Sequence, residues 1–229
     1  MRILLTGSEG FIASHLKKRL PSTEIVSMMD KKIGIDCSDP DVYPTENHPD
    51  VIIHLAATLQ PKDDGDIRMM RTVYDYWKKS GAHLIYTSSA SIYNPDTLYA
   101  VQKLYGEVMF KGAGILRLFN VYGSGGSGIV DIIKNTKKKV VINGDGWQTR
   151  DFIHVGDVVN RILYDASDKF IGDKDVGTGY ETSIKQLCSI ANIEPSYNKD
   201  ADVGVVKSRA LIQSGDAYMN SLEKYLCPE

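Results

Sequence analysis

The sequence has few of the features that mark secreted, membrane-spanning or metal-binding proteins. Only three of its 229 residues are cysteines, Cys37, Cys188 and Cys227, an odd number at unrelated spacings. This pattern fits neither a disulfide framework nor a set of metal ligands, so we expect a reducing compartment, the cytoplasm, and no metal site. No apolar run reaches the roughly 18–20 residues that a membrane helix needs. The apolar start of the chain is interrupted by Gly7 and Glu9, and we expect no signal peptide there.

An excess of charge of one sign is also absent. The chain carries 27 lysines and arginines against 29 aspartates and glutamates, a formal net charge of −2. It therefore gives no electrostatic reason to expect nucleic acid or an anionic membrane as a partner. What is present is an ordinary globular composition, with 42% hydrophobic and 24% charged residues. A chain of this length can bury one large core, or one core and a small lobe.

Short apolar runs alternate with longer stretches of helical period through the first half of the chain. Strands are predicted at 2–6, 24–29, 51–56, 83–87 and 114–118, and helices at 11–20, 67–79 and 98–111. Later elements are predicted as helices at 155–166, 183–193 and 214–225 and a strand near 175–177. Buried strands separated by helices predict an α/β fold with a doubly wound parallel sheet.

Two segments after the fifth predicted strand have a low-complexity or charged composition. Residues 123–128 read Gly-Ser-Gly-Gly-Ser-Gly, which by composition alone indicates a bare flexible linker. Residues 137–139 are three lysines, which we interpret as a solvated helix end and not as a binding patch.

A glycine-rich turn lies between the first predicted strand and the first helix. Gly7 and Gly10 allow a sharp turn and a close approach of the helix N-terminus to a pyrophosphate, and Ala13 allows close packing of helix and strand. The second strand ends at Asp30, where a carboxylate can accept hydrogen bonds from ribose hydroxyls. A carboxylate there repels a 2′-phosphate and favours NAD over NADP. Lys31 and Lys32 follow directly and attract such a phosphate, so NADP stays open as an alternative.

A serine, a tyrosine and a lysine form the candidate catalytic set. The strand at 83–87 runs into Ser88 and Ser89, and the next helix carries Tyr99 and Lys103 four residues apart, on one face. A lysine ammonium beside a phenol lowers the phenol pKa, which makes tyrosine a usable general base. A serine at the carboxyl end of a strand lies where open α/β sheets bind ligands.

With these motifs in order, the sequence resembles the extended short-chain dehydrogenase/reductase family, the NAD-dependent nucleotide-sugar epimerases and dehydratases. The matching stretches are LLTGSEGFIASHL (4–16), HLAA (54–57), TSSASIY (87–93), YAVQK (99–103), RLFNVYG (117–123), INGDGWQTRDFIHVGDV (142–158) and VGTG (176–179).

The resemblance implies roles for individual residues. Tyr99 is implied as the catalytic acid/base, Lys103 as its partner on the nicotinamide ribose, and Ser89 as the donor to the sugar oxygen. The implied cofactor-binding residues are Gly7, Gly10, Phe11, Ile12, Asp30, Asp36, Leu55, Ala56 and Ala57, together with Tyr99 and Lys103. Asn120 and Arg150 are implied to hold the substrate diphosphate, since a guanidinium fork suits that task. Trp147, in a loop near Arg150, is a candidate to stack on the nucleotide base, and His54 is interpreted as a structural residue.

The sequence departs from the family in three respects. The predicted helix 67–79 lacks the asparagine that the family usually has there. The segment between RLFNVYG and INGDG and the C-terminal lobe are both short. Ala90 and Ser91 follow Ser89 where the dehydratases place Asp-Glu, so dehydration is disfavoured.

These observations lead to one expected organisation. A Rossmann domain for NAD is expected from 1–120 and 151–180, and a small discontinuous substrate lobe from 121–150 and 181–229, with the substrate in the cleft between them. The expected function is epimerisation of a nucleotide-linked sugar, at C4, through a transient 4-keto intermediate. A nucleotide-sugar 4-keto reductase or dehydrogenase, or a non-catalytic nucleotide-binding relative, are the alternatives.

A homodimer is also expected. The helices at 64–80 and 97–112 carry more apolar surface than one sheet face can cover, and related enzymes pair through these helices. Such a dimer is expected to place Met69, Tyr76 and Met109 near their mates across the two-fold axis.

Overall fold

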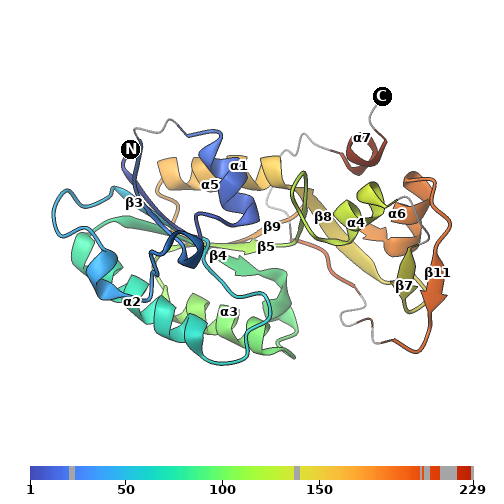
Figure 1. The fold of residues 1–229 in the computed structure, drawn as a ribbon, viewed down its shortest axis with the longest axis horizontal. Coiled ribbons are helices and arrows are strands. Elements are labelled where there is room, and N and C mark those ends of the chain that lie inside the picture. The colour runs from blue at the N-terminus through green and yellow to red at the C-terminus, as the bar shows by residue number, and fades with distance from the viewer. Residues whose placement is uncertain (21–23, 137–139, 202, 204–206, 212–220, 228–229) are drawn as a thin grey trace. The chain divides into compact units, whose positions relative to one another are not determined.

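Six strands form the central sheet of the protein, in the order β2-β1-β3-β4-β5-β9 (Figure 1). The computed structural model describes residues 1–20, 24–136, 140–201, 203, 207–211 and 221–227. The strands are β1 Ile3–Thr6, β2 Ile25–Met29, β3 Val51–His54, β4 His83–Ser89, β5 Gly114–Leu118 and β9 Gly172–Val176. β1 pairs in parallel with both β2 and β3, and β3 pairs in parallel with β4. Every residue of β1 and β3 is buried, as the continuous apolar runs predict.

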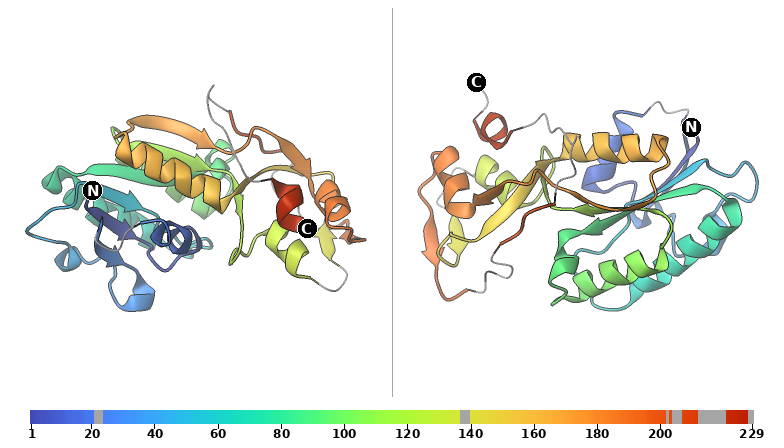
Figure 2. Two further views of the ribbon diagram at one scale, coloured as in Figure 1. Left: turned by 90° about the horizontal axis from the view of Figure 1, so that it is seen from above. Right: turned by 180° about the vertical axis from the view of Figure 1, so that it is seen from behind.

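Helices cover both faces of this sheet. α1 (Phe11–Lys17) and α5 (Val155–Ser167) lie over one face, and α2 (Gly65–Ser80) and α3 (Leu98–Met109) lie over the other (Figures 1 and 2). The core under α2 and α3 includes Val73, Trp77 and Phe110, packed against Ile52 and Leu84 of the sheet. The doubly wound α/β fold predicted from the sequence is therefore confirmed.

The helix ends follow local capping chemistry. α2 ends at Ser80 and is capped by Gly81, whose φ of 70° is the left-handed conformation that glycine adopts without strain. α3 begins after Thr97, whose hydroxyl accepts a hydrogen bond from the backbone N–H of Ala100. α1 is shorter than predicted and ends at Lys17, before Pro21, which lies outside the described residues. Short 3₁₀ helices run over Lys31–Ile33 (η2), Pro40–Val42 (η3) and Ala90–Tyr93 (η4).

A second set of elements was largely missed by the sequence analysis. β6 (Asn120–Tyr122), β8 (Thr149–His154) and β10 (Glu181–Ser183) form a sheet in the order β10-β8-β6, and β7 (Val141–Asn143) pairs with β11 (Ser196–Asn198). The helices are α4 (Ile129–Asn135), α6 (Ile184–Ile190) and α7 (Leu222–Leu226). Most of these strands have three residues, too few to show an alternating pattern. The predicted helix at 214–225 falls partly on residues 212–220, outside the described part.

These elements group into two compact units. One comprises residues 1–117 and 159–174, and the other comprises 118–158 and 175–229. Residues 118–120, 151–158 and 175–180, which were predicted to belong to the nucleotide domain, fall in the second unit. The division of roles between a nucleotide-binding and a substrate-binding unit stays a prediction.

The glycine-rich segment 123–128 is not a bare linker. Its first glycine, Gly123, donates its N–H to the buried carboxylate of Asp131 at 3.1 Å. Gly126 passes so close to the same carboxylate that a Cβ there would collide with Asp131 Oδ2. Glycine is therefore required by close packing around a buried acid. The lysine run 137–139 lies outside the described residues.

No helix in the described part of the chain is long and apolar enough to cross a lipid bilayer.

Candidate functional site

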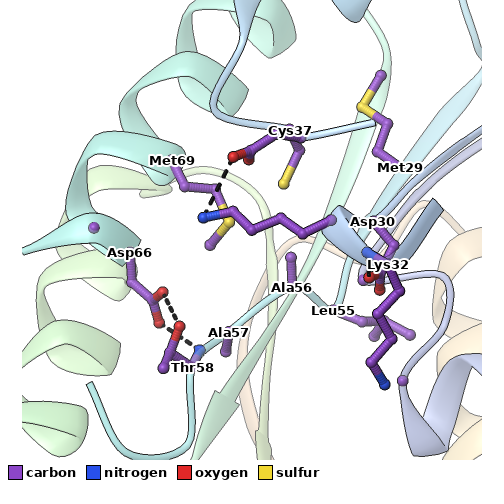
Figure 3. Close-up of a pocket in the computed structure, with 15 residues that line it drawn as sticks. Met29, Asp30, Lys32, Cys37, Leu55, Ala56, Ala57, Thr58, Asp66 and Met69 are labelled. Atoms are coloured by element: carbon purple, nitrogen blue, oxygen red, sulfur yellow. Dashed lines mark hydrogen bonds and ion pairs between the residues drawn. The ribbon is translucent and has the colours of Figure 1, made fainter. Parts of the chain in front are cut away.

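A cavity of about 260 Å³ lies at the carboxyl ends of β1, β2 and β3 (Figure 3). Because β1 lies between β2 and β3, this is the point where the strand order reverses, the usual ligand site of an open α/β sheet. The predicted cofactor residues that line it are Gly7, Gly10, Asp30, Asp36, Leu55, Ala56 and Ala57. The sheet topology thus brings residues from three separate stretches of sequence to one cavity.

The glycine turn has no room for side chains. Gly7 has a φ of +67°, and a Cβ there would lie 2.7 Å from the backbone nitrogen of Ala56. Its N–H donates to the carbonyl of Met29 at 2.8 Å, and the N–H of Gly10 donates to the carbonyl of Gly7 at 3.0 Å. The turn therefore packs directly on the ends of β2 and β3 and forms a bare backbone wall of the cavity.

Phe11 and Ile12 follow this turn as the first residues of α1, and both are half-buried. They are not among the residues that line the cavity. The first N–H groups of a helix have no carbonyl partner within that helix and favour an anion. The role of these two residues in binding the cofactor pyrophosphate stays a prediction.

Asp30 joins the turn to the segment after β2. One carboxylate oxygen accepts the N–H of Glu9 at 3.0 Å, and the other accepts the N–H of Lys32 at 2.9 Å. These two bonds fix the carboxylate at the edge of the cavity, and each oxygen keeps a further lone pair for a ribose hydroxyl. The geometry is compatible with the predicted contact to the adenosine ribose.

Asp36 and Lys31 form an ion pair on the same side, with 3.3 Å between Nζ and Oδ2. Burial raises the pKa of Asp36, but hydrogen bonds from Ser38 and Lys31 outweigh it and hold the pKa below its ordinary value. The neighbouring Cys37 is buried, and burial raises its thiol pKa to about 12. The cavity therefore presents a fixed anion at Asp36 and an unreactive thiol at Cys37.

Ser89, Tyr99 and Lys103 lie near one another. Ser89 is the last residue of β4, and Tyr99 and Lys103 lie in the first half of α3. Lys103 is only 6% exposed, and its Nζ donates to the carbonyl of Thr87 at 2.7 Å. The same nitrogen lies 5.9 Å from the centre of the Tyr99 ring. Ser89 accepts hydrogen bonds from the N–H and hydroxyl of Ser91 at 3.2 and 3.0 Å, which leaves its own proton for donation.

The pKa values of Tyr99 and Lys103 differ from the expectation that the lysine lowers the pKa of the phenol. Burial raises the pKa of Tyr99 above its ordinary value, a hydrogen bond with Ser89 lowers it by less, and the charge of Asp66 raises it. Burial lowers the pKa of Lys103 to about 8, although Asp66 raises it. The expected lowering of the phenol pKa by lysine is thus wrong for this structure, because desolvation of the phenolate dominates.

A second, water-sized cavity of about 10 Å³ lies beside Tyr99 and Lys103. Its lining shares Ala56, Ala57, Asp66 and Met69 with the larger cavity. The candidate catalytic side chains are therefore next to the nucleotide cavity, on the side of β3.

Sequence reasoning missed Asp66 and Gln102. Asp66 lies in the first turn of α2, one residue before the predicted start of that helix, and it lines both cavities. Gln102 is buried and donates its amide to the carbonyl of Asp63 at 2.6 Å, which ties α3 to the loop before α2. The position of Asp66 at the cavities and the bond of Gln102 to Asp63 both depend on the packing of distant segments. Neither leaves a local signal in the sequence.

His54 behaves as the structural residue that the sequence analysis expected. It is fully buried, and its Nδ1 lies 2.6 Å from the hydroxyl of Thr6. Burial lowers the pKa of His54 to about 3, so the ring is neutral.

Asn120 and Arg150 belong to the second unit and lie on neighbouring strands. Asn120 pairs with Phe152 in the parallel β6–β8 register, so it shares a sheet face with Arg150, two residues before Phe152. Asn120 donates to the carbonyl of Asp151, and Arg150 donates to the carbonyls of Thr149 and Val203. Neither contact is with a carboxylate. Their role toward a diphosphate stays a prediction.

Comparison with known proteins gives a consistent result. The profile of the NAD dependent epimerase/dehydratase family matches residues 3–173. The chain is 29% identical to a putative UDP-glucose 4-epimerase of Methanocaldococcus jannaschii, over 87% of this chain and 84% of that protein. It is also 29% identical to a UDP-glucose 4-epimerase of Mycolicibacterium smegmatis, over 82% and 80% of the two chains. A crystal structure of Thermotoga maritima UDP-glucose 4-epimerase with UDP-glucose superposes with a TM-score of 0.81 at 22% identity, covering 99% and 96% of the two chains.

The geometry of the cavity itself fits a dinucleotide cofactor. A side chain at Gly7 would block the backbone wall, the helix N-terminus follows directly, and Asp30 is held at the end of β2. These are the parts that bind a pyrophosphate and a ribose in a Rossmann fold. The chain therefore belongs to the NAD-dependent epimerase/dehydratase family, as an extended short-chain dehydrogenase/reductase with NAD as its cofactor.

Proposed function

We propose that the protein is an NAD-dependent epimerase that inverts C4 of a UDP-linked sugar through a transient 4-keto intermediate. The observation that carries the proposal is the meeting of Ser89, Tyr99 and Lys103 beside the nucleotide cavity. Family membership and the two relatives named UDP-glucose 4-epimerase support the choice of reaction and substrate class.

The proposed proton transfers use residues of one unit. When bound, NAD supplies a reversible acceptor for the hydride of the sugar carbon. Tyr99, as the phenolate, takes the proton of the C4 hydroxyl and later returns it to the inverted alkoxide, so no proton is consumed. Ser89 donates a hydrogen bond to the same sugar oxygen, and Lys103 holds the ribose with its ammonium group. The ammonium of Lys103 lies 5.9 Å from the centre of the Tyr99 ring.

We propose that Asn120 and Arg150 hold the diphosphate of the substrate. Both lie on one face of the β6–β8 pair. Arg150 donates to the neutral carbonyls of Thr149 and Val203, and burial lowers the pKa of its guanidinium. A charged diphosphate is a stronger hydrogen-bond acceptor than a neutral carbonyl, so it would bind this guanidinium better than its present partners do.

Replacement of Tyr99 by phenylalanine tests the reaction. Tyr99→Phe should reduce turnover of UDP-glucose by about 10²–10⁴-fold, because the hydroxyl moves the proton. NAD affinity should stay nearly unchanged, since the ring is retained. The measurements are the rate of conversion to UDP-galactose and the dissociation constant of NAD.

Tyr164→Phe is the matched control, since Tyr164 is an exposed tyrosine on α5. It should leave both quantities unchanged. A loss of less than about tenfold in Tyr99→Phe contradicts the assignment. Accumulation of a keto product with release of NADH by the wild type favours the dehydrogenase alternative, the oxidative direction of the reaction that a 4-keto reductase catalyses.

We also propose a homodimer, with a corrected contact surface. Met69 and Tyr76, expected at the dimer axis, are each only 8% exposed, and the ring of Tyr76 packs at a tilt against that of Tyr43, with 4.6 Å between the ring centres. They belong to the core, because α2 turns this face toward the sheet. Met109 of α3, the third residue expected at the axis, is partly buried against the same core. The exposed apolar side chains on α3 are Leu98, Val101, Leu104, Tyr105 and Val108, which we name the α3 row. Their spacing places them together on the helix surface.

We propose the cytoplasm as the location. The cysteines of the chain, Cys37, Cys188 and Cys227, are all free thiols, which fits a reducing compartment.

A further inference from the structure

Asp66 holds a fixed negative charge at the boundary between the two cavities. Its two carboxylate oxygens accept the backbone N–H and the hydroxyl of Thr58, at 2.7 and 2.8 Å (Figure 3). These bonds hold the side chain at the start of α2, on the wall that it shares with Ala57 and Met69. The carboxylate is therefore positioned by the fold and is half-buried.

Lys103 faces the same water-sized cavity as Asp66 and has only neutral direct contacts among the described residues. Its ammonium donates to the carbonyl of Thr87 at 2.7 Å and lies 5.0 Å from the centre of the Tyr86 ring. Burying an ammonium group without a negative charge nearby is costly. The site provides such a charge in Asp66. Its carboxylate and the Lys103 ammonium line one small cavity, which has room for one water molecule.

We propose that Asp66 is a positioning residue that keeps Lys103 in its charged, ribose-binding form. The inference rests on the proposed role of Lys103 toward the cofactor ribose. Asp66 touches neither the sugar nor a transferred proton in this proposal, and it acts through Lys103.

The other titratable groups around Lys103 do not supply this charge. His54 of β3 is neutral, because burial lowers its pKa to about 3. Tyr86 of β4 is a neutral phenol, because burial raises its pKa well above the ordinary value. Tyr99 of α3 also has a raised pKa. Near Asp66, Arg68 is paired with Asp64 at 2.8 Å.

The charge of Asp66 affects both catalytic groups in the same direction. It raises the pKa of Lys103, which burial lowers to about 8, and it raises the pKa of Tyr99. Without it, Lys103 loses its proton at a lower pH and Tyr99 becomes the phenolate at a lower pH. Loss of the Asp66 charge therefore moves both protonation equilibria to lower pH.

Asp66→Asn tests this inference through NAD binding. The asparagine amide can still bond to Thr58, so the shape of the site is retained. NAD affinity of the wild type should fall as the pH rises through the pKa of Lys103, and in the variant this fall should occur at lower pH. A shift of roughly half a unit or more is expected, which is about threefold in affinity at pH values above both midpoints. Asp66→Ser, a second neutral side chain, should shift the midpoint in the same direction.

Two controls separate this effect from damage to the fold. Asp75→Asn removes the same charge from the exposed face of α2 and should leave the midpoint unchanged. In a Lys103→Met background, Asp66→Asn should not move the remaining pH dependence, because the group on which it acts is gone. Equal midpoints in wild type and Asp66→Asn, or an affinity loss of the same size at every pH, overturns the inference. Absence of NAD binding by the wild type would instead count against the proposed function itself.

Discussion

At the scale of single residues, Asp30 combines a structural bond with a proposed recognition role. Its carboxylate accepts one N–H from the glycine turn and one from η2, so it joins these two segments at the edge of the cavity. Lys31 is paired with Asp36, whereas the ammonium of Lys32 donates to the neutral carbonyl of Glu9 at 3.4 Å. Loss of the Asp30 carboxylate leaves at least one lysine able to turn toward a 2′-phosphate.

Asp30→Ala should therefore change the cofactor preference. NAD affinity should fall and NADP affinity should rise, because the ribose acceptor and the repulsion of the 2′-phosphate are removed together. We expect the ratio of the two affinities to change by about tenfold, which corresponds to a free-energy difference of ~1.4 kcal/mol. Isothermal titration with each cofactor measures it.

The control for this change is Asp41→Ala, which removes an exposed carboxylate from η3 outside the cavity lining. Its affinity ratio should equal that of the wild type. Tighter binding of NADP than of NAD by the wild type contradicts the proposed role of Asp30.

The sequence predicted candidate site residues that lie close together in the chain. It did not predict those that come together only in the folded structure. Tyr99 and Lys103 lie four residues apart on one helix, and Gly7 and Gly10 lie in one turn, so the sequence displays each pair. Asp66 meets Lys103 only because α2 and α3 pack side by side on the sheet. No spacing rule connects residues 37 positions apart in the chain.

At the scale of elements, α3 approaches β4 closely at Gly106. A Cβ there would lie 2.6 Å from Cζ of Tyr86 and 2.8 Å from Sδ of Met70. Tyr86 also donates its hydroxyl to the carbonyl of Lys103, one turn earlier on the same helix. The glycine thus sets the depth at which α3 carries Lys103, the proposed partner of the cofactor ribose.

Gly106→Ala should push α3 outward. Overpacking of a buried contact typically costs about 1–3 kcal/mol, so the free energy of unfolding should fall by this amount. Turnover should fall as well, because Lys103 moves with the helix. Urea denaturation and steady-state rates measure the two effects.

A double-mutant cycle identifies the cause. Tyr86→Leu removes the ring atoms that meet the new methyl group and leaves only the contact with Met70 Sδ, so the double variant should lose less stability than the sum of the two single variants. Lys111→Ala, an exposed change just after α3, should alter stability by less than about 0.5 kcal/mol. Simple additivity contradicts the proposed close contact.

The sequence predicted the elements of the first unit well because their signals are long or strongly capped. α2 has five buried residues at helical spacing and a glycine stop, and β5 was predicted at its observed bounds. The three-residue strands β6, β10 and β11 owe their existence to pairing with partners elsewhere in the chain. The loop at 123–128 was mistaken for a linker because the buried acid that orders it, Asp131, lies outside the glycine run.

At the scale of the whole molecule, the α3 row is an apolar surface without a partner inside the described chain. Val108, at 71% exposure, is its most exposed member. The neighbouring face of α2 carries Arg71, whose guanidinium hydrogen-bonds the hydroxyl of Tyr105 and so borders the row with charge. An apolar centre with a polar border is the usual composition of a protein interface. A second copy of the chain can cover the row by pairing α3 with α3 about a two-fold axis.

This assembly gives the last prediction. Light scattering at micromolar concentration should give a mass of two chains for the wild type. Val108→Lys should give a mass of one chain, because an ammonium would be buried in each copy's part of the contact. Ile171→Lys places the same charge at another exposed apolar residue of the same unit and should remain a dimer. A wild-type mass of one chain contradicts the dimer. Dissociation of both variants would place the interface elsewhere on the unit, whereas dissociation of Val108→Lys alone assigns it to α3, the helix that also carries Tyr99 and Lys103.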